Sequence, residues 1–278
     1  MNILITGANG FLGKHLVRFL RNDHNLFLIH RRPEGNLKEV IVMDLENVET
    51  VTNSFRYELL NTQVDVVIHC AAILVNTGNI FDFSVFEKNH AITKSLIHIV
   101  KTCKVKKLIN LSTIGVYPNI SGQYNELSAV APSHNSECMY SLSKICSEEL
   151  FRFFLSDTSV VINLRLGQTY GPGMRNDRIY AMMQEELRTK NKISVRGNGE
   201  RVSNFVTVDY FLQTMNKIIR HSLPSGTYNL GEKNCSYLSL AESIIEKYGN
   251  PDSRSELEAE GVKAKVYIDS SKLINALG

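Results

Sequence analysis

The sequence predicts a doubly wound α/β fold, in which helices cover both faces of a parallel sheet, followed by a small C-terminal α/β lobe. Three observations over the 278 residues support this. Strand-like runs alternate with helical patterns through the first two-thirds of the chain, as in repeated strand–helix–strand units. Those runs are apolar at successive positions, as expected of strands buried on both faces. A glycine-rich turn joins the first run to the first helical segment.

The first two-thirds of the chain supplies the predicted sheet and its covering helices. We expect strands at residues 2–6, 26–30, 40–42, 64–68, 107–111 and 160–166. The spacing of apolar positions predicts helices at residues 11–21, 86–103 and 140–155. A Gly-Pro-Gly sequence at residues 171–173 ends the pattern.

Shorter elements follow from residue 176 onward. We expect helices at residues 180–190, 210–220 and 238–248 and strands at residues 193–195 and 205–208. This region shows no repeating sheet of its own. We therefore assign residues 1–170 to the main domain and residues 171–278 mainly to the lobe.

The turn after the first strand contains Gly7, Gly10 and Gly13. Glycine permits a tight turn and a close approach of the backbone. The following helix would then present its free N–H groups and positive dipole end to a pyrophosphate. The spacing differs from the usual GxGxxG fingerprint, and a turn made only for packing is the alternative. Together with the alternation, the turn predicts a dinucleotide site.

Tyr140 and Lys144 lie four residues apart in a predicted helix, so they share one face. An ammonium group beside a phenol favours the phenolate and lowers the tyrosine pKa from its ordinary value of about 10. We therefore expect Tyr140 to act as a general acid and base. An exposed surface pair is the alternative for such a motif on its own.

Further motifs follow the glycine turn in a fixed order. They are HCAA at residues 69–72, Ser-Thr at 112–113, YSLSK at 140–144, RLGQTYGP at 165–172 and NFVTVD at 204–209. This order resembles the extended short-chain dehydrogenase/reductase family, whose members are nucleotide-sugar epimerases, dehydratases and reductases. The resemblance covers essentially the whole chain. It implies a Rossmann-type sheet, an NAD(P) cofactor, a nucleotide-sugar substrate and a substrate-binding lobe.

The resemblance also implies roles for single residues. Tyr140 passes the proton, Lys144 holds the nicotinamide ribose, and Thr113 hydrogen-bonds the reacting oxygen. Asn89 matches a family asparagine linked through water to the lysine, and it could equally be a buried polar residue that fixes its helix. The residues expected to bind the cofactor are Gly7, Asn9, Gly10, Phe11, Leu12, Gly13, Arg31, Arg32, Asp44, Leu45, Cys70, Ala71, Ala72 and Lys144.

Arg31 and Arg32 follow the second predicted strand, where NAD-binding proteins carry an acidic residue for the adenosine ribose. Arginines suit the 2′-phosphate of NADP, and a solvated pair is the alternative. Asp44 resembles a residue that contacts the adenine and does not bear on the phosphate. We therefore expect NADPH as the cofactor, with NAD less favoured.

Two positions depart from the family pattern. Gln168 replaces the usual asparagine, and Ser203 stands where many members carry an arginine that grips the substrate. Arg201 lies two residues earlier, and strand side chains repeat every two residues, so Arg201 would share that face. We expect Thr113, Tyr140, Gln168 and Arg201 to contact the substrate.

The residues after Thr113 indicate which of the family's reactions this chain catalyses. Dehydratases of the family carry Asp-Glu there as acid and base, whereas this chain has Ile114 and Gly115. Without those carboxyl groups, elimination of water lacks its proton carriers. We expect NADPH-dependent reduction of a nucleotide-activated 4-keto-6-deoxy sugar for surface polysaccharide. The alternatives are an NAD-dependent nucleotide-sugar 4-epimerase and a non-catalytic dinucleotide-binding regulatory subunit.

Composition restricts the partners. The net charge is +3 with scattered basic residues, so we expect neither nucleic-acid nor membrane binding. The five cysteines form no CxxC pair, and we expect no metal site and reduced thiols. No apolar run is long enough to span a bilayer, and the first predicted strand begins at residue 2, so we expect a cytoplasmic protein. We expect a homodimer through the two long helices at residues 86–103 and 140–155. The apolar positions of these helices exceed what one sheet face should need, and they include Ile92, Leu96, Ile99, Leu150, Phe153 and Phe154.

Overall fold

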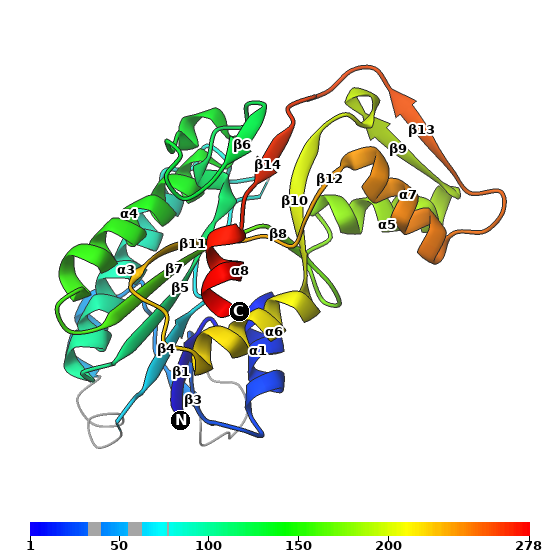
Figure 1. The fold of residues 1–278 in the computed structure, drawn as a ribbon. Coiled ribbons are helices and arrows are strands. Elements are labelled where there is room, and N and C mark those ends of the chain that lie inside the picture. The colour runs from blue at the N-terminus through cyan, green and yellow to red at the C-terminus, as the bar shows by residue number, and fades with distance from the viewer. Residues whose placement is uncertain (33–39, 55–62, 77) are drawn as a thin grey trace.

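A parallel sheet forms the centre of the fold (Figure 1). The computed structural model describes residues 1–32, 40–54, 63–76 and 78–278. The strands of this sheet are β1 (Asn2–Thr6), β2 (Asn25–His30), β3 (Val40–Val42), β4 (Val66–His69), β5 (Lys107–Thr113), β7 (Val160–Leu166) and β11 (Gly226–Leu230). Within the described residues their order is β11-β7-β5-β4-β1-β2-β3. The order reverses between β1 and β4, and doubly wound sheets bind ligands in the crevice at such a reversal. The predicted fold class is confirmed.

Helices α1 (Phe11–Leu20) and α6 (Val208–Arg220) lie side by side over one face of the sheet (Figure 1). The helix α6 begins after Thr207, whose side chain accepts a hydrogen bond from the Tyr210 backbone N–H at 3.1 Å. Its apolar side chains recur at helical spacing and are buried against β1, β4, β5 and β7. One continuous apolar core therefore joins the N-terminal and C-terminal halves of the chain.

Helices α2 (Val48–Ser54), α3 (Ser84–Thr102) and α4 (Cys138–Leu155) cover the opposite face. Ile92, Leu96 and Ile99 of α3 are at most 5% exposed and pack within this chain. The prediction that these three residues are in excess of what the sheet needs is therefore wrong, because they fill the core between α3 and the strands. Of the predicted interface positions, Phe153 and Phe154 on α4 are exposed.

The lobe lies beyond one end of the main sheet (Figure 1). Its two-stranded sheet pairs β9 (Lys192–Arg196) with β13 (Arg254–Glu258), next to α5 (Ile179–Lys190) and α7 (Tyr237–Tyr248). A second sheet connects the lobe to the main domain, in the order β12 (Lys233–Ser236), β10 (Val202–Thr207) and β8 (Gln168–Tyr170). A third sheet pairs β6 (Gly122–Tyr124) with β14 (Val266–Ile268).

The chain returns from the lobe to the main sheet. The strand β11 pairs in parallel with β7, and α8 (Ser271–Leu277) packs on β11. Part of residues 171–278 therefore completes the main domain, while the division at residue 170 stays a prediction. The predicted ranges of the other elements agree with the structure to within three residues at each end. None of the described helices combines the length and apolarity that a bilayer crossing requires.

Candidate active site

The turn between β1 and α1 is packed so closely that two of its residues must be glycine. Gly7 has a φ of +66°, and a Cβ there would lie 2.6 Å from the Ala71 backbone nitrogen. At Gly13 a Cβ would lie 2.1 Å from the Gly7 carbonyl oxygen. No side chain caps the N-terminus of α1, which starts after Gly10. The first N–H groups of α1 can therefore bind an anionic group.

A cavity of about 690 Å³ opens beside this turn, at the carboxyl ends of the central strands. All residues expected to bind the cofactor line it, from Gly7 to Lys144, and so does Tyr140. Their gathering in one cavity, next to a helix N-terminus, fits an extended dinucleotide whose pyrophosphate lies on α1.

At the outer end of this cavity, Arg31 forms an ion pair with Glu46, with 2.8 Å between Nη1 and Oε1. The Arg31 side chain is 58% exposed and that of Glu46 is 22% exposed. Glu46 also donates its backbone N–H to the Asp44 carboxylate at 3.0 Å. Sequence reasoning missed Glu46, although its position directly after Asp44 and Leu45 was a signal for it. The arrangement can serve a ribose phosphate if Arg31 exchanges Glu46 for that anion.

Tyr140 and Lys144 lie one turn apart on α4 and both face the cavity. Burial lowers the pKa of the Lys144 ammonium group to about 8, and Glu148 and Cys70 oppose that fall. Burial raises the pKa of the Tyr140 phenol to about 12, with Glu137 adding to the rise and Arg178 opposing it. The predicted lowering of the Tyr140 pKa by Lys144 is wrong for this structure, because a phenolate would lose its hydration.

Thr113 ends β5, and its hydroxyl accepts a hydrogen bond from the Gly115 backbone N–H at 3.0 Å. A Cβ at Gly115 would lie 2.9 Å from the Ser141 hydroxyl and 3.3 Å from that of Thr113. Ile114 packs in a small core with Val116. A side chain at residue 115 therefore requires its neighbours to move.

Asn89 connects α3 to the loop after β4 and to α4. Its Oδ1 accepts from the Ile73 N–H at 2.7 Å, while its Nδ2 donates to the Ile73 carbonyl at 3.0 Å and to the Ser143 hydroxyl at 3.1 Å. Ser143 in turn donates to the Tyr140 carbonyl at 2.7 Å. These contacts fit the role of a buried polar residue that fixes its helix. A water link to Lys144 stays a prediction.

A buried carboxylate that sequence reasoning missed lies behind the cavity. Glu148 is 2% exposed and forms a salt bridge with Arg165, with 2.9 Å between Oε2 and Nη2. It also accepts a hydrogen bond from the Ser112 hydroxyl. A buried charge is costly unless it is paired, so the pairing with Arg165 allows the Glu148 carboxylate to lie in the interior. The signal for it was its helical spacing of four residues after Lys144.

The two departures from the family pattern contact each other. The amide Nε2 of Gln168 on β8 donates to the Ser203 hydroxyl on β10 at 2.8 Å. The Arg201 guanidinium lies over the Tyr237 ring, 5.0 Å from its centroid. Arg201 thus lies in a different environment from Gln168.

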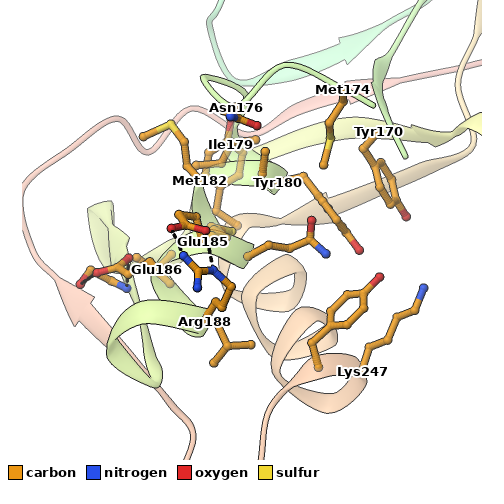
Figure 2. A pocket seen from close by; sticks show the side chains of 18 of the residues that line it. Tyr170, Met174, Asn176, Ile179, Tyr180, Met182, Glu185, Glu186, Arg188 and Lys247 are labelled. Atoms are coloured by element: carbon orange, nitrogen blue, oxygen red, sulfur yellow. Dashed lines mark hydrogen bonds and ion pairs between the residues drawn. The ribbon is translucent and has the colours of Figure 1, made fainter. Parts of the chain in front are cut away.

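Arg201 also lines a second hollow, of about 2230 Å³, over α5 and α7. Tyr170 lies beside Tyr180 there (Figure 2), and their ring centroids are 4.1 Å apart. Lys247 of α7 also lines the hollow. Aromatic faces and cationic groups are the side chains that bind bases and phosphates. The hollow can therefore accept an aromatic or an anionic group of a ligand.

Comparisons with known proteins agree with this fold. The model of the NAD dependent epimerase/dehydratase family matches residues 3–231. A dTDP-D-glucose 4,6-dehydratase of Dictyostelium discoideum is 28% identical in sequence, and the match covers 87% of this chain and 61% of that protein. The chain thus spans less than two thirds of that relative's length.

A dTDP-4-dehydro-6-deoxy-D-allose reductase of a Streptomyces species is 25% identical, with 90% of this chain and 82% of that protein covered. The crystal structure of UDP-N-acetylglucosamine 4-epimerase from Bacillus cereus has the same fold, with a TM-score of 0.81 and 23% identity. That match covers 100% of this chain and 90% of the epimerase chain.

Proposed function

This chain belongs to the NAD-dependent epimerase/dehydratase family, and from that premise we propose that it is an NADPH-dependent reductase of a nucleotide-activated 4-keto-6-deoxy sugar. Such a reaction turns the keto group of the sugar into an alcohol. We propose that the product is a precursor of surface polysaccharide, made in the cytoplasm.

The placement of Tyr140 beside Lys144 on α4, in the cavity that the expected cofactor residues line, carries the proposal. With a pKa of about 12, the Tyr140 phenol keeps its proton at neutral pH. Reduction of a keto group requires a proton donor at the oxygen, and Tyr140 is that donor. A bound nicotinamide supplies the hydride. Lys144 holds the ribose and Thr113 donates a hydrogen bond to the reacting oxygen.

The surroundings of Thr113 favour reduction over elimination of water. Gly115 carries no side chain, and its contacts with Ser141 and Thr113 leave little room for one. Ile114 is apolar and packs in a core. Elimination needs an acid and a base next to the sugar, and these two positions offer neither.

Arg31 and Arg32 support NADPH as the cofactor. Both line the outer end of the cofactor cavity. A guanidinium group binds a phosphate with two parallel hydrogen bonds, which a ribose hydroxyl cannot match. The ion pair between Arg31 and Glu46 shows that Arg31 can reach an anion at this end of the cavity.

A nucleotide-sugar 4-epimerase is the second candidate, because solved epimerase structures share this fold. An epimerase would use the same Thr113, Tyr140 and Lys144 while retaining its cofactor. The Streptomyces relatives named as 4-dehydro-6-deoxy-allose reductases favour reduction instead. A non-catalytic regulatory subunit is the third candidate, and the intact pair of Tyr140 and Lys144 argues against it.

The direct test is a mass-spectrometric screen of nucleotide-activated 4-keto sugars with NADPH. We expect stoichiometric consumption of NADPH and a product heavier by two hydrogens. The Tyr140→Phe variant is the control for consumption unrelated to the site. Purified protein that carries tightly bound NAD and interconverts two nucleotide sugars without added cofactor would show the epimerase alternative to be correct.

A further inference from the structure

The buried carboxylate of Glu148 connects three elements of the active site. On α4 it lies one turn after Lys144. It accepts a hydrogen bond from Ser112, which directly precedes Thr113 on β5. It also binds Arg165 on β7 through two guanidinium nitrogens, Nη2 at 2.9 Å from Oε2 and Nε at 3.2 Å from Oε1.

This connection continues to the edge of the main sheet. The Arg165 Nη1 atom donates to the Tyr117 hydroxyl at 3.0 Å, and that hydroxyl donates to Asn229 Oδ1 on β11 at 2.8 Å. Tyr117 is 1% exposed and Asn229 is 0% exposed. Hydrogen bonds with these short distances in a buried network fix the relative positions of the elements that carry them.

We propose that Glu148 is a positioning residue: its carboxylate holds the catalytic helix α4 against the carboxyl ends of β5 and β7, so that Tyr140 and Lys144 stay in register with Thr113. The role rests on the reduction proposed above, in which these three residues act on one substrate oxygen. Small displacements of such groups reduce reaction rates strongly.

The charges around Glu148 provide a second measurable effect of this residue, on the pKa of Lys144. The titratable groups that face this region are Lys144 and Tyr140 from α4, Arg165 from β7, Tyr117 from the turn after β5, and His69 and Cys70 from the end of β4. Further charges act on the two tyrosines, Glu137 and Arg178 on Tyr140 and Glu126 on Tyr117. Burial and Lys144 hold the pKa of His69 well below its usual range, so His69 is neutral. Burial raises the pKa of the Cys70 thiol to about 12. Glu148 is thus the anion that offsets Lys144 and Arg165.

The neighbouring glutamate offers a matched control. Glu149 is exposed on the outer side of α4 and pairs only with Arg152, one turn later, among the described residues. Its replacement by glutamine makes the same chemical change one residue away, in solvent. Any general effect of removing a carboxylate from α4 will therefore appear in both variants.

The experiment compares Glu148→Gln, Glu148→Asp, Ser112→Ala and Glu149→Gln by NADPH consumption over a range of pH. Glu148→Gln should lower kcat about 10- to 100-fold through misplacement of α4. It should also move the alkaline limb of the pH profile down by about one unit, because Lys144 loses its nearby anion. Glu148→Asp should lower kcat but keep the limb in place, since the charge remains. Ser112→Ala should also lower kcat and keep the alkaline limb in place, in a protein that still folds. Glu149→Gln should have the kcat and the pH profile of the wild type.

A second measurement does not depend on the reaction. In protein labelled with ¹³C at the lysine side chains, the titration of Lys144 should occur at lower pH in Glu148→Gln than in Glu149→Gln. Wild-type kcat and an unmoved Lys144 titration in Glu148→Gln, with only a lower Tm, would overturn the positioning role. If Glu148→Gln does not fold, wild-type kcat in Ser112→Ala overturns it. A moved Lys144 titration in a protein that reduces no 4-keto sugar would instead overturn the proposed function alone.

Discussion

Gln168 donates a hydrogen bond to Ser203 at 2.8 Å, so the two positions that differ from the family pattern form one contact between β8 and β10. A shorter side chain at residue 168 would not need the same partner, and an arginine at residue 203 would not leave room for this hydroxyl contact. The two differences are therefore parts of a single local rearrangement. Under the proposed function, the anionic part of the substrate would bind to other cations, of which Arg201 is the nearest along the chain.

Arg201→Ala should raise the KM for the nucleotide sugar. A charge-assisted hydrogen bond contributes about 1.5 to 3 kcal/mol, which corresponds to roughly a 10- to 150-fold change in KM. The value of kcat should change little, because the diphosphate is remote from the reacting carbon. Steady-state kinetics check this, with Arg254→Ala in the same lobe as the control, since Arg254 is exposed and pairs with Glu256. An unchanged KM in Arg201→Ala would exclude this residue from the substrate site.

Tyr140→Phe should slow the reduction by about 10² to 10⁴, because the proton donor is lost. Cofactor binding should persist, since the phenylalanine ring fills the same space. Fluorescence titration with NADPH and NADPH consumption measure the two effects separately. Tyr267→Phe, at a position 43% exposed on β14, should have wild-type activity. A fully active Tyr140→Phe would remove Tyr140 from the mechanism.

Activity should fall above a pH of about 8, where Lys144 loses its proton. Stability should move in the opposite direction. The pKa of Lys144 is about 8 in the folded protein and 10.5 as its ordinary value, so between these values the unfolded chain binds more protons. The contribution of Lys144 to the free energy of unfolding therefore increases with pH across this window.

The pH prediction is checked by kcat/KM profiles and by denaturant unfolding of the wild type and Lys144→Met. The difference in unfolding free energy between the two proteins isolates the lysine. Lys144→Met should also bind cofactor more weakly, because Lys144 has two tasks. A rise in activity across the same window would contradict the assignment of Lys144 as a working cation.

Replacing both Arg31 and Arg32 by alanine should weaken NADPH binding by at least about tenfold, because each phosphate contact contributes about 1.5 to 3 kcal/mol. NADH binding should stay nearly unchanged. Arg18→Ala on the exposed side of α1 is the control. Isothermal titration calorimetry with both cofactors decides the matter. Equal affinities of the wild type for NADPH and NADH would contradict the cofactor assignment.

We predict a homodimer in which α3 and α4 of two copies pack together. Ile92, Leu96 and Ile99 are buried inside the chain, and the predicted interface positions that are exposed are Phe153, at 79%, and Phe154, at 43%. Large exposed aromatic groups at adjacent positions are typical of a covered surface. Replacing both by serine should give a monomer in sedimentation velocity at micromolar concentration.

The control for the dimer prediction is Leu127→Ser, at a loop position 95% exposed and outside both helices. This variant should sediment like the wild type. A wild-type monomer at micromolar concentration would rule the predicted interface out.

Much of the fold could be predicted because its signals are local. The strands β1, β2, β3, β5 and β7 appear as short apolar runs, and α1 and α4 as helical spacings, near their observed bounds. The strand β11 was missed. Its sequence, Gly-Thr-Tyr-Asn-Leu, lacks the apolar run of the predicted strands, because Asn229 is polar although it is buried, and it joins β7 across an intervening lobe. Pairing over such a sequence separation leaves no pattern within either segment.

The candidate site also combines features that depend on nearby residues with features that depend on distant ones. The glycine turn and the four-residue spacing of Tyr140 and Lys144 could be read from the chain, because a tight turn and a helical face depend only on nearby residues. The depth at which these residues are buried could not be read from the sequence. That burial raises the pKa of Tyr140, whereas the sequence predicted a lowered pKa.

Glu148 and Glu149 show the difference most clearly. The sequence determined that both lie in one helix, since their neighbours have the helical spacing of apolar residues. The tertiary structure alone paired the Glu148 carboxylate with Arg165, while Glu149 lies in solvent. The spacing of apolar residues predicts which side of a helix is buried. Which charged group on that side meets a partner depends on strands that are distant in the chain. Burial and electrostatics are sums over all surrounding atoms, so they become defined only when those atoms are brought together.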